Sequence, residues 1–284
     1  MRPKNRNKAA FWESGMINDV TFMHYFRKLT EVATTIYQWE NVPDNIDIRF
    51  LELALFTDGQ AVLFKDDVLR EYMGLRCIPS GGWNVYNVPK KRQAYATNGY
   101  HINLDENNSV IVYNNYMRTP TKVDAIMYAQ RLWDLDRTID VNAKAQKTPV
   151  ILSCPENLRF SILDLYKKWS GNEPFIISDP KLDMSQIKVL NTGAPYNADK
   201  IYNLKTNIWN EALESMGVPN LQNEKRERMI DKEISTTQGA TRALRCSGLE
   251  MRQKACEQFN NMFGEKMSVR YRDDIDVFVE VNKE

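Results

Sequence analysis

The side chains that most often bind metals are sparse in this sequence. The cysteines are Cys77, Cys154, Cys246 and Cys256, and the histidines are His24 and His101. A structural zinc site needs about four nitrogen or sulfur ligands, usually in closely spaced pairs. No two of these cysteines have the C-x-x-C spacing, and the two histidines are far apart. We therefore expect reduced, mostly buried thiols and no metal site.

The carboxylates and the known catalytic motifs offer no better pattern. Asp134 and Asp136 are two positions apart on an expected helix, so they point to different faces and would not share a proton or a metal. The sequence has no phosphate-binding loop of the G-x-x-x-x-G-K-[ST] type and no G-x-S-x-G turn. We expect no catalytic residue and no cofactor. A metal-dependent nuclease with carboxylates from several elements stays open as an alternative.

The one charge feature above background lies at the start of the sequence. Arg2, Lys4, Arg6 and Lys8 place four cations in eight residues with no acid among them. Such a segment is either a solubilising tail or a flexible arm that neutralises phosphates, each contact adding to the salt dependence of binding. Both interpretations stay open on these residues alone.

The helices and strands that would position these residues can be predicted from the spacing of apolar residues and from the Gly, Pro and Asn residues that interrupt it. Helical spacing predicts helices over about 18–40, 48–56, 121–147, 161–169, 199–216 and 248–263. Short apolar runs predict strands at 61–64, 110–113, 150–153, 175–178, 187–190 and 269–272. Residues 79–108, rich in Gly, Pro and Asn, are expected to form loops with short strands. The fold class is therefore α+β and mainly helical.

The predicted helix over 121–147 has an unusual surface. At 1.5 Å per residue it would run roughly 40 Å. Asp134 and Asp136 alternate with Trp133 and Leu135, so polar and apolar positions are mixed around it. Such a helix suits contacts with neighbours on more than one side. The β-α-β-β module that follows is too small for much stability of its own.

Composition excludes several classes of protein. The chain has 284 residues, 38 Lys+Arg against 37 Asp+Glu, and 43% hydrophobic residues. These values are ordinary for a folded protein of about two domains and exclude a disordered chain. A wholly basic nucleic-acid binder would have a pI above about 9. The sequence has no apolar run of about 18 residues for a membrane span, and no signal peptide is expected. Trp39, Trp133, Trp169 and Trp209 fall at apolar helical positions, which favours packing over base stacking.

Several short runs, taken in order, carry a family resemblance. They are residues 37–43 (YQWENVP), 110–115 (VIVYNN), 142–150 (NAKAQKTPV), 171–174 (GNEP), 194–196 (APY), 199–200 (DK), 209–211 (WNE), 224–229 (EKRERM) and 255–257 (ACE). Their joint order resembles the portal (head–tail connector, upper collar) family of small short-tailed phages of the Bacillus podophage type, which have protein-primed genomes. No single run is a chemical motif.

The resemblance implies an architecture and a function. The portal fold would have a basic arm (1–17), a wing (18–120 and 218–275), two stem helices (121–147 and 199–217), a small β-α-β-β clip (148–198) and a tail (276–284). Twelve copies would form a ring at one capsid vertex, the channel for DNA packaging and ejection. The protein would be structural rather than enzymatic, assembled in the host cytoplasm and kept in the virion.

The resemblance also implies partners and site residues. The partners would be double-stranded DNA, the major capsid and scaffolding proteins, the lower collar or tail protein, and a packaging ATPase with or without a packaging RNA; no membrane is involved. The arm residues Arg2, Lys4, Arg6 and Lys8 would contact the motor. Residues 223–244 would form a channel loop containing Glu224, Lys225, Arg226 and Arg228. The family has lysine at two further channel positions; Lys200 matches one, whereas Asn191 stands at the other.

The balanced charge fits a conduit. Duplex DNA carries one charge per about 1.7 Å, so a channel of about 40 Å encloses about 24 phosphates. A uniformly basic lining would hold that DNA, whereas a mixed lining would let it slide. The alternative from another class is a monomeric nucleic-acid-binding module that uses the basic arm.

Overall fold

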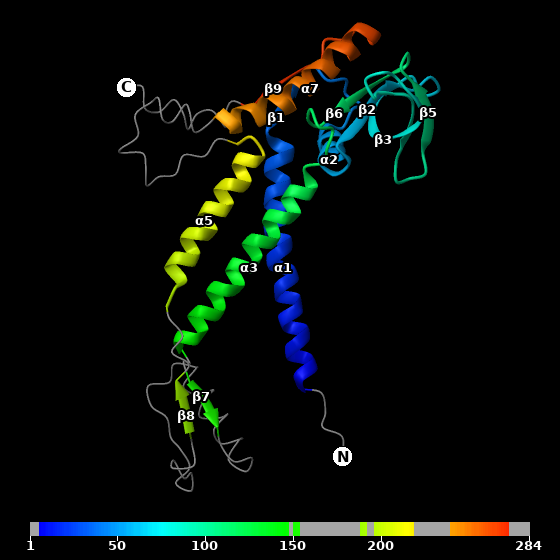
Figure 1. The fold of residues 1–284 in the computed structure, drawn as a ribbon. Coiled ribbons are helices and arrows are strands. Elements are labelled where there is room, and N and C mark those ends of the chain that lie inside the picture. The colour runs from blue at the N-terminus through cyan, green and yellow to red at the C-terminus, as the bar shows by residue number, and fades with distance from the viewer. Residues whose placement is uncertain (1–5, 148–149, 154–187, 192–195, 219–238, 273–284) are drawn as a thin grey trace. The chain divides into compact units, whose positions relative to one another are not determined.

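The computed structural model describes residues 6–147, 150–153, 188–191, 196–218 and 239–272 (Figure 1). The chain divides into two compact units. The first combines Met1–Trp133 with Asn207–Glu284, and the second is Asp134–Thr206. The division leaves the two ends of the sequence in one unit and the middle in the other.

A five-stranded antiparallel sheet forms the main core of the first unit. Its strands are β2 (Gln60–Lys65), β3 (Tyr72–Trp83), β4 (Pro89–Tyr95), β5 (His101–Asp105) and β6 (Ser109–Tyr113), in the order β5-β4-β3-β2-β6. β2 confirms the strand expected at 61–64, and its residues Ala61 to Phe64 are fully buried. Val62 and Phe64 pack with Cys77, Ala94 and Leu104 from the neighbouring strands. β6 confirms the strand expected at 110–113.

The stretch 79–108 is more regular than expected. β3, β4 and β5 cover most of it, and its Gly and Asn residues fall largely in turns between strands. The register of β3 and β4 shifts between Pro79 and Gly81, and Gly81 and Gly82 take positive φ. The expected loops with short strands are therefore confirmed, but composition did not give the bounds of these strands, which are set by pairing with neighbouring strands.

Helix α2 (Ile48–Asp58) covers part of this sheet and has clear signals at both ends. The side chain of Asp47 accepts a hydrogen bond of 3.0 Å from the backbone N–H of Phe50, which caps the helix N-terminus. Gly59 ends the helix with φ 79°, and a Cβ there would lie 2.8 Å from the carbonyl oxygen of Arg118. Only glycine fits this close approach at that backbone angle.

The first helix extends further back than predicted and ends earlier. α1 spans Arg6–Thr35, whereas the prediction was about 18–40. The segment Tyr37–Glu40 is strand β1, which pairs antiparallel with β9 (Ser268–Tyr271). Trp39 is therefore a strand residue and not the helical residue that was expected. Local spacing could not predict this, because its pairing partner Val269 is 230 positions away. The expected strand at 269–272 is confirmed within one residue.

The last helix also begins earlier than predicted. α7 spans Gly239–Phe263 rather than 248–263, and it packs along β6 and β9. The end of the expected channel loop, residues 239–244, is therefore helical. The rest of that loop lies outside the described residues. Gly264 follows the helix with φ 75°, a left-handed conformation that commonly ends helices.

The helices expected over 121–147 and 199–216 are present. α3 spans Lys122–Lys147 and α5 spans Ala198–Ser215, close to the predicted 121–147 and 199–216. The strands β7 (Val150–Ser153) and β8 (Lys188–Asn191) pair antiparallel in the second unit. The expected helix at 161–169 and strand at 175–178 lie outside the described residues.

Candidate functional site

The described residues include only some of the predicted site residues. Arg6 and Lys8 lie in the first turns of α1, and therefore in a helix rather than a flexible arm. Lys200 is exposed in the first turn of α5, and Asn191 ends β8 opposite Val150. Arg2, Lys4, Glu224, Lys225, Arg226 and Arg228 lie outside the described residues. Only Arg6, Lys8, Asn191 and Lys200 of the predicted set are therefore placed within their helices and strands.

The described part of the chain holds no group of three or more His, Cys, Asp or Glu side chains placed to bind a metal ion. Cys77 and Cys256 are buried and Cys246 is exposed, all three as free thiols. Burial raises the pKa of Cys77 and of Cys256 to about 12, so both thiols stay protonated and unreactive. None of the described helices is both long and apolar enough to span a bilayer.

Helices α3 and α5 contact each other through polar side chains in both units. In the first unit the Tyr128 hydroxyl donates to Glu211 Oε1 at 3.3 Å, and Arg131 Nη1 lies 3.5 Å from the same carboxylate. In the second unit Lys205 Nζ lies 2.6 Å from Asp136 Oδ1. The contacts join later residues of α3 to earlier residues of α5, so the helices pair antiparallel.

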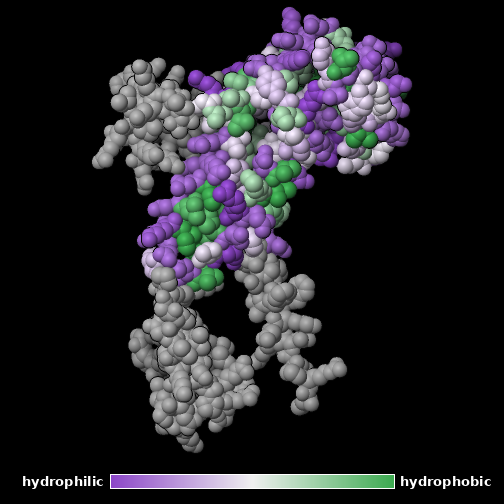
Figure 2. All heavy atoms as spheres, in the orientation of Figure 1, coloured by the Kyte–Doolittle hydropathy of each residue, from purple (hydrophilic) through white to green (hydrophobic). Residues whose placement is uncertain are grey.

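The surfaces of these helices also expose large apolar side chains. Figure 2 shows apolar residues gathered over α5 and over the first part of α3. On α3, Val123, Ile126 and Met127 are exposed at i, i+3 and i+4 and therefore share one face. Tyr202 and Leu204 are exposed on α5. Single exposed apolar residues are ordinary, but a run on one helix face marks an interaction surface.

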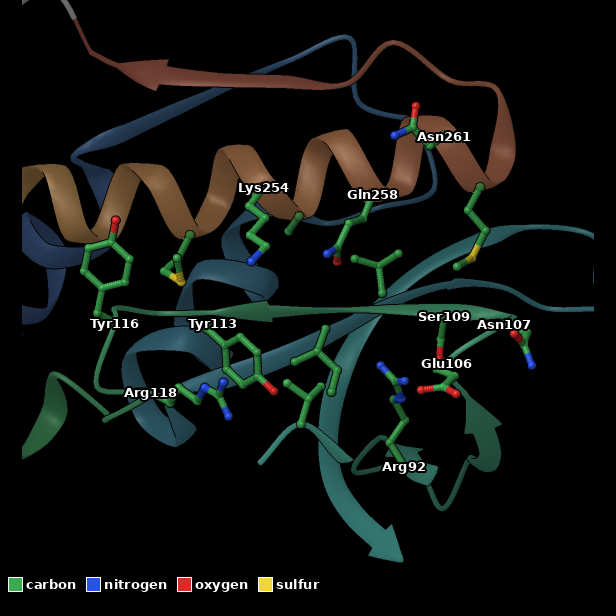
Figure 3. A pocket seen from close by; sticks show the side chains of 16 residues that line it. Arg92, Glu106, Asn107, Ser109, Tyr113, Tyr116, Arg118, Lys254, Gln258 and Asn261 are labelled. Carbon is green, nitrogen blue, oxygen red and sulfur yellow. The ribbon is translucent and has the colours of Figure 1, made fainter. Parts of the chain in front are cut away.

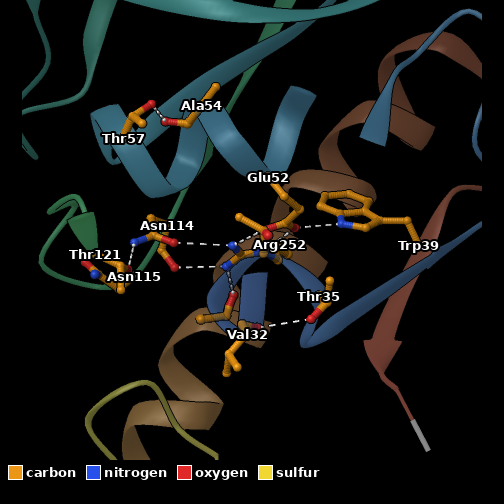
Figure 4. A network of polar contacts seen from close by, with 12 residues as sticks. Val32, Thr35, Trp39, Glu52, Ala54, Thr57, Asn114, Asn115, Thr121 and Arg252 are labelled. Carbon is orange, nitrogen blue, oxygen red and sulfur yellow. Dashed lines mark hydrogen bonds and ion pairs between the residues drawn. The ribbon is translucent and has the colours of Figure 1, made fainter. Parts of the chain in front are cut away.

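A buried ion pair lies where α2, α7 and β1 meet (Figure 4). Arg252 of α7 donates to Glu52 of α2 through two nitrogens, Nε at 2.8 Å and Nη2 at 2.7 Å. Glu52 Oε1 also accepts from Trp39 Nε1 at 2.8 Å. Arg252 Nη1 donates to the carbonyl oxygens of Asn114 and Gly248, both at 3.0 Å. Every part of this buried charge pair is therefore satisfied, which is the condition for such a pair to be tolerated.

The ring of Tyr37 completes this polar network. The guanidinium carbon of Arg252 lies 3.9 Å from the centre of that ring. Burial raises the pKa of the Tyr37 hydroxyl, so it stays neutral. Burial alone would lower the pKa of Arg252, but the facing Glu52 carboxylate leaves it raised. The network holds α7 against α2, β1 and the residue that follows β6. The sequence patterns did not predict any of these contacts.

The fold is similar to a chain in the structure of the portal and tail of native bacteriophage P68, with a TM-score of 0.51, 15% sequence identity, and coverage of 99% of this chain and 97% of that chain. At this sequence identity the likeness shows the fold alone, which is that of a phage portal. A family model described as Phage Connector (GP10) matches residues 6–276, and the chain therefore belongs to the phage connector family.

Two further solved structures are similar over most of this chain. One is an HK97 family phage portal protein from Corynebacterium diphtheriae, with 12% identity, a TM-score of 0.45, and coverage of 93% of this chain and 96% of that chain. The other is a chain in the neck of an empty gene transfer agent particle, with 10% identity, a TM-score of 0.45, and coverage of 98% and 86%.

Family and fold together define the role. The chain is a phage portal, or head–tail connector, protein of the virion, and it is a structural protein rather than an enzyme. This confirms the α+β portal fold and the portal function that the resemblance implied. It also favours that function over the monomeric nucleic-acid-binding module and the metal-dependent nuclease.

Proposed function

We propose that twelve copies of this chain form a ring at one capsid vertex, and that duplex DNA passes through its channel during packaging and ejection. The proposal extends to the phage type, a small short-tailed phage with a protein-primed genome. Membership of the connector family over residues 6–276 is the observation that carries it. The partners would be the major capsid and scaffolding proteins, the lower collar or tail protein, and a packaging ATPase with or without a packaging RNA.

The exposed apolar face of α3 supports a ring. Val123, Ile126 and Met127 lie on one side of the helix and contact water in the single chain. A neighbouring copy would bury them, and each buried apolar side chain contributes about 1.5–3 kcal/mol when it leaves water completely. The domains would be the basic arm (1–17), the wing (18–120 and 218–275), the stem (121–147 and 199–217), the clip (148–198) and the tail (276–284).

The channel and motor residues are part of this proposal. Exposed Lys200 at the start of α5 and Asn191 at the end of β8 would face the DNA near the junction of stem and clip. Glu224, Lys225, Arg226 and Arg228 would line the channel within the loop 223–244. Arg2, Lys4, Arg6 and Lys8 would contact the motor.

The mass of the full-length protein in solution tests the ring. Twelve copies of a 33.1 kDa chain amount to about 400 kDa. Mass photometry should find this species, and negative-stain images should show a ring with a central channel. A stable 33 kDa monomer at micromolar concentration would contradict the proposal and favour the monomeric nucleic-acid-binding alternative.

A matched pair of variants tests which surface closes the ring. Ile126→Glu places a charge on the exposed face of α3 and should shift the population strongly toward monomers. Val68→Glu makes the same type of change at an exposed position between β2 and β3 and should leave the ring intact. Circular dichroism checks that both variants are folded. An Ile126→Glu protein that still forms complete rings would remove this face from the interface.

A further inference from the structure

A cavity of about 770 Å³ lies between α7 and the sheet of the first unit (Figure 3). Lys254 and Gln258 reach into it from α7, and Tyr113 lines it from β6. Arg92 and Glu106 lie together at one end, and Arg118 lies near Tyr113. The volume is within the range of ordinary ligand pockets. No described function of the chain accounts for it.

The central feature of the cavity is a buried arginine. Arg92 of β4 is 4% exposed, and its Nε has no hydrogen-bond partner. Burial lowers the pKa of Arg92, since the charged form has lost water without gaining an ion pair. The Tyr113 hydroxyl, also on the cavity wall, is buried and has no hydrogen-bond partner. Buried polar groups are normally paired, so two orphaned donors in one cavity point to a missing acceptor.

The charges around the cavity define which acceptor fits. The lining includes three cations, Arg92, Arg118 and Lys254, and one carboxylate, Glu106. The Arg118 guanidinium lies over the Tyr113 ring and donates to the carbonyl oxygen of Asn87 at 2.6 Å, which fixes its position. The lining therefore has an excess of two positive charges and would attract an anionic group.

The rest of the lining favours an occupant that has apolar groups as well as negative charge. Val88, Val110, Ile111, Met251 and Met262 form apolar parts of the wall. The charged phosphates of a DNA backbone would gain nothing from contact with these side chains. A peptide segment that alternates carboxylates with apolar side chains satisfies both parts of the cavity.

We propose that this cavity binds the acidic segment 273–284 of a copy of this chain (DDIDVFVEVNKE). The segment has five carboxylates and one lysine, and its carboxylates are interleaved with Ile, Val and Phe. The expected contacts are ion pairs from its Asp or Glu side chains to Arg92 and Lys254, with its apolar side chains against Met251 and Met262. The segment lies outside the described residues, so charge and apolar complementarity carry the assignment.

The described end of the chain lies within reach of the cavity. The Tyr271 hydroxyl donates to the carbonyl oxygen of Arg245 on α7. β9 packs on the face of α7 opposite the cavity, because Gln253 and Asn260 contact β9 and Met267, whereas Lys254 and Gln258 line the cavity. The segment would therefore pass around the helix, which is about 10 Å wide, and turn back by about 9 Å along it. Twelve extended residues span about 40 Å, so the segment is long enough to reach the cavity of its own copy. The same binding to a neighbouring copy is equally compatible with the proposal, which does not depend on the ring.

Carbodiimide coupling on the full-length protein tests the contact directly. The reagent activates a carboxylate as an O-acylisourea; the Lys254 amine then forms the amide, and the urea leaves with the elements of water. Mass spectrometry should find Lys254 joined to Asp274, Asp276 or Glu280. The pair Lys205 and Asp136, 2.6 Å apart, is the internal positive control. Coupling of that pair while Lys254 joins only Glu106, or nothing, would overturn the proposal.

Binding of a synthetic peptide of sequence 273–284 to the protein gives a quantitative test. The host is the full chain with Asp274→Asn, Asp276→Asn and Glu280→Gln, which removes competition from its own segment. Adding Lys254→Glu, an exposed helix position, should weaken binding at least tenfold. Lys266→Glu makes the same charge change at an exposed position outside the cavity lining and should change binding less than twofold.

Two further probes separate the peptide from a simple anion. A peptide with the same three carboxylates replaced by amides should bind at least tenfold more weakly. Inorganic phosphate should compete only at millimolar concentration. Equal binding of the neutralised peptide, or phosphate binding as tight as the acidic peptide, would overturn the proposal.

Discussion

Arg252 and Glu52, separated by 200 positions in the sequence, face each other at 2.7 Å with both side chains 2% exposed. The pair joins the last long helix to α2, and Arg252 also donates to the carbonyl oxygen of Asn114, which directly follows β6. Removing a charge from water costs free energy, and each of these residues compensates that cost for the other by pairing with it. The relationship explains how segments from both ends of the sequence are held as one unit, although α3 and the second unit separate them in the chain.

Loss of one partner should destabilise the fold strongly. Arg252→Met leaves the Glu52 carboxylate buried with only Trp39 Nε1 as a described hydrogen-bond partner. Removal of one member of a buried pair costs about 3–5 kcal/mol. Urea unfolding followed by tryptophan fluorescence measures the loss. Replacing both residues, Arg252→Met with Glu52→Gln, should cost clearly less than the sum of the single changes.

A surface pair provides the control for this prediction. Arg270 Nε and Glu40 Oε1 are also 2.7 Å apart, but both side chains are about two-fifths exposed. Arg270→Gln should therefore cost no more than about 1 kcal/mol. Equal losses for Arg252→Met and Arg270→Gln would mean that the buried pair has no special role.

Gly248 should be the most sensitive glycine of α7. A Cβ at this position would overlap the Tyr37 hydroxyl and lie 3.1 Å from its ring carbon Cζ. Gly248→Ala should therefore push β1 away from α7 and cost about 1–3 kcal/mol, the usual range for overpacking. Thermal unfolding of the full chain measures the change.

Gly239 on the same helix gives the matched comparison. Nothing lies within 4 Å of a Cβ added there. Because Gly239 is the first residue of the helix and a side chain there meets open space, Gly239→Ala should change stability by no more than about 0.5 kcal/mol. A destabilisation equal to that of Gly248→Ala would show that the loss comes from glycine's backbone freedom and not from the contact with Tyr37.

The parts of the fold that the sequence predicted well are those set by local signals. α2, α3, α5, β2 and β6 have strong apolar periodicity or flanking breakers, and they lie within about two residues of their expected ends. β1 was assigned to a helix because Tyr37 to Glu40 continue the apolar spacing of α1. These four residues form a strand because they pair with β9, more than 200 residues away, and a local sequence pattern cannot predict such pairing.

The functional features divide in the same way. The family runs identified the portal class, since their order is a property of the linear sequence. The cavity around Arg92 and the pair of Arg252 with Glu52 were not anticipated, because Arg92, Glu52 and Arg252 each look like ordinary surface residues in the sequence. The one available signal was a charged residue within an apolar pattern, as Glu52 is among Leu51, Leu53 and Ala54.

Acid should destabilise the protein partly through Asp66. A hydrogen bond from Tyr100 lowers the pKa of the Asp66 carboxyl from 3.8, and backbone bonds of 2.8 Å from Leu69 and Val68 act in the same direction. A depressed folded pKa adds stability that is present above the unfolded pKa and is lost as pH falls through the folded value. Stability from Asp66 should therefore be complete at pH 5 and decline below about pH 4.

Asp66→Asn isolates this contribution. The variant should be less stable than the original protein at pH 7, and the gap should narrow as pH falls below about 4. Urea midpoints at pH 7, 5 and 3 measure it, with Asp67→Asn as the exposed neighbouring control. A gap that stays constant across these pH values would assign the loss to packing rather than to the carboxylate charge.

Added positive charge along α3 should slow DNA packaging if the proposed channel is correct. Asp134 and Thr138 are exposed polar positions one turn apart on this helix. Asp134→Lys with Thr138→Lys would add about 24 lysines to a ring of twelve, and each phosphate contact they make adds to the salt dependence of DNA binding. Packaging in vitro should therefore slow most at low salt and recover as salt is raised.

Asp44→Lys with Asn45→Lys, exposed before α2, makes the same charge change in the wing and should leave the rate unchanged. An unchanged rate in the α3 variant at low salt would mean that this stretch of the helix does not meet the moving DNA. Equal slowing in both variants would mean that total charge, and not a channel surface, sets the rate.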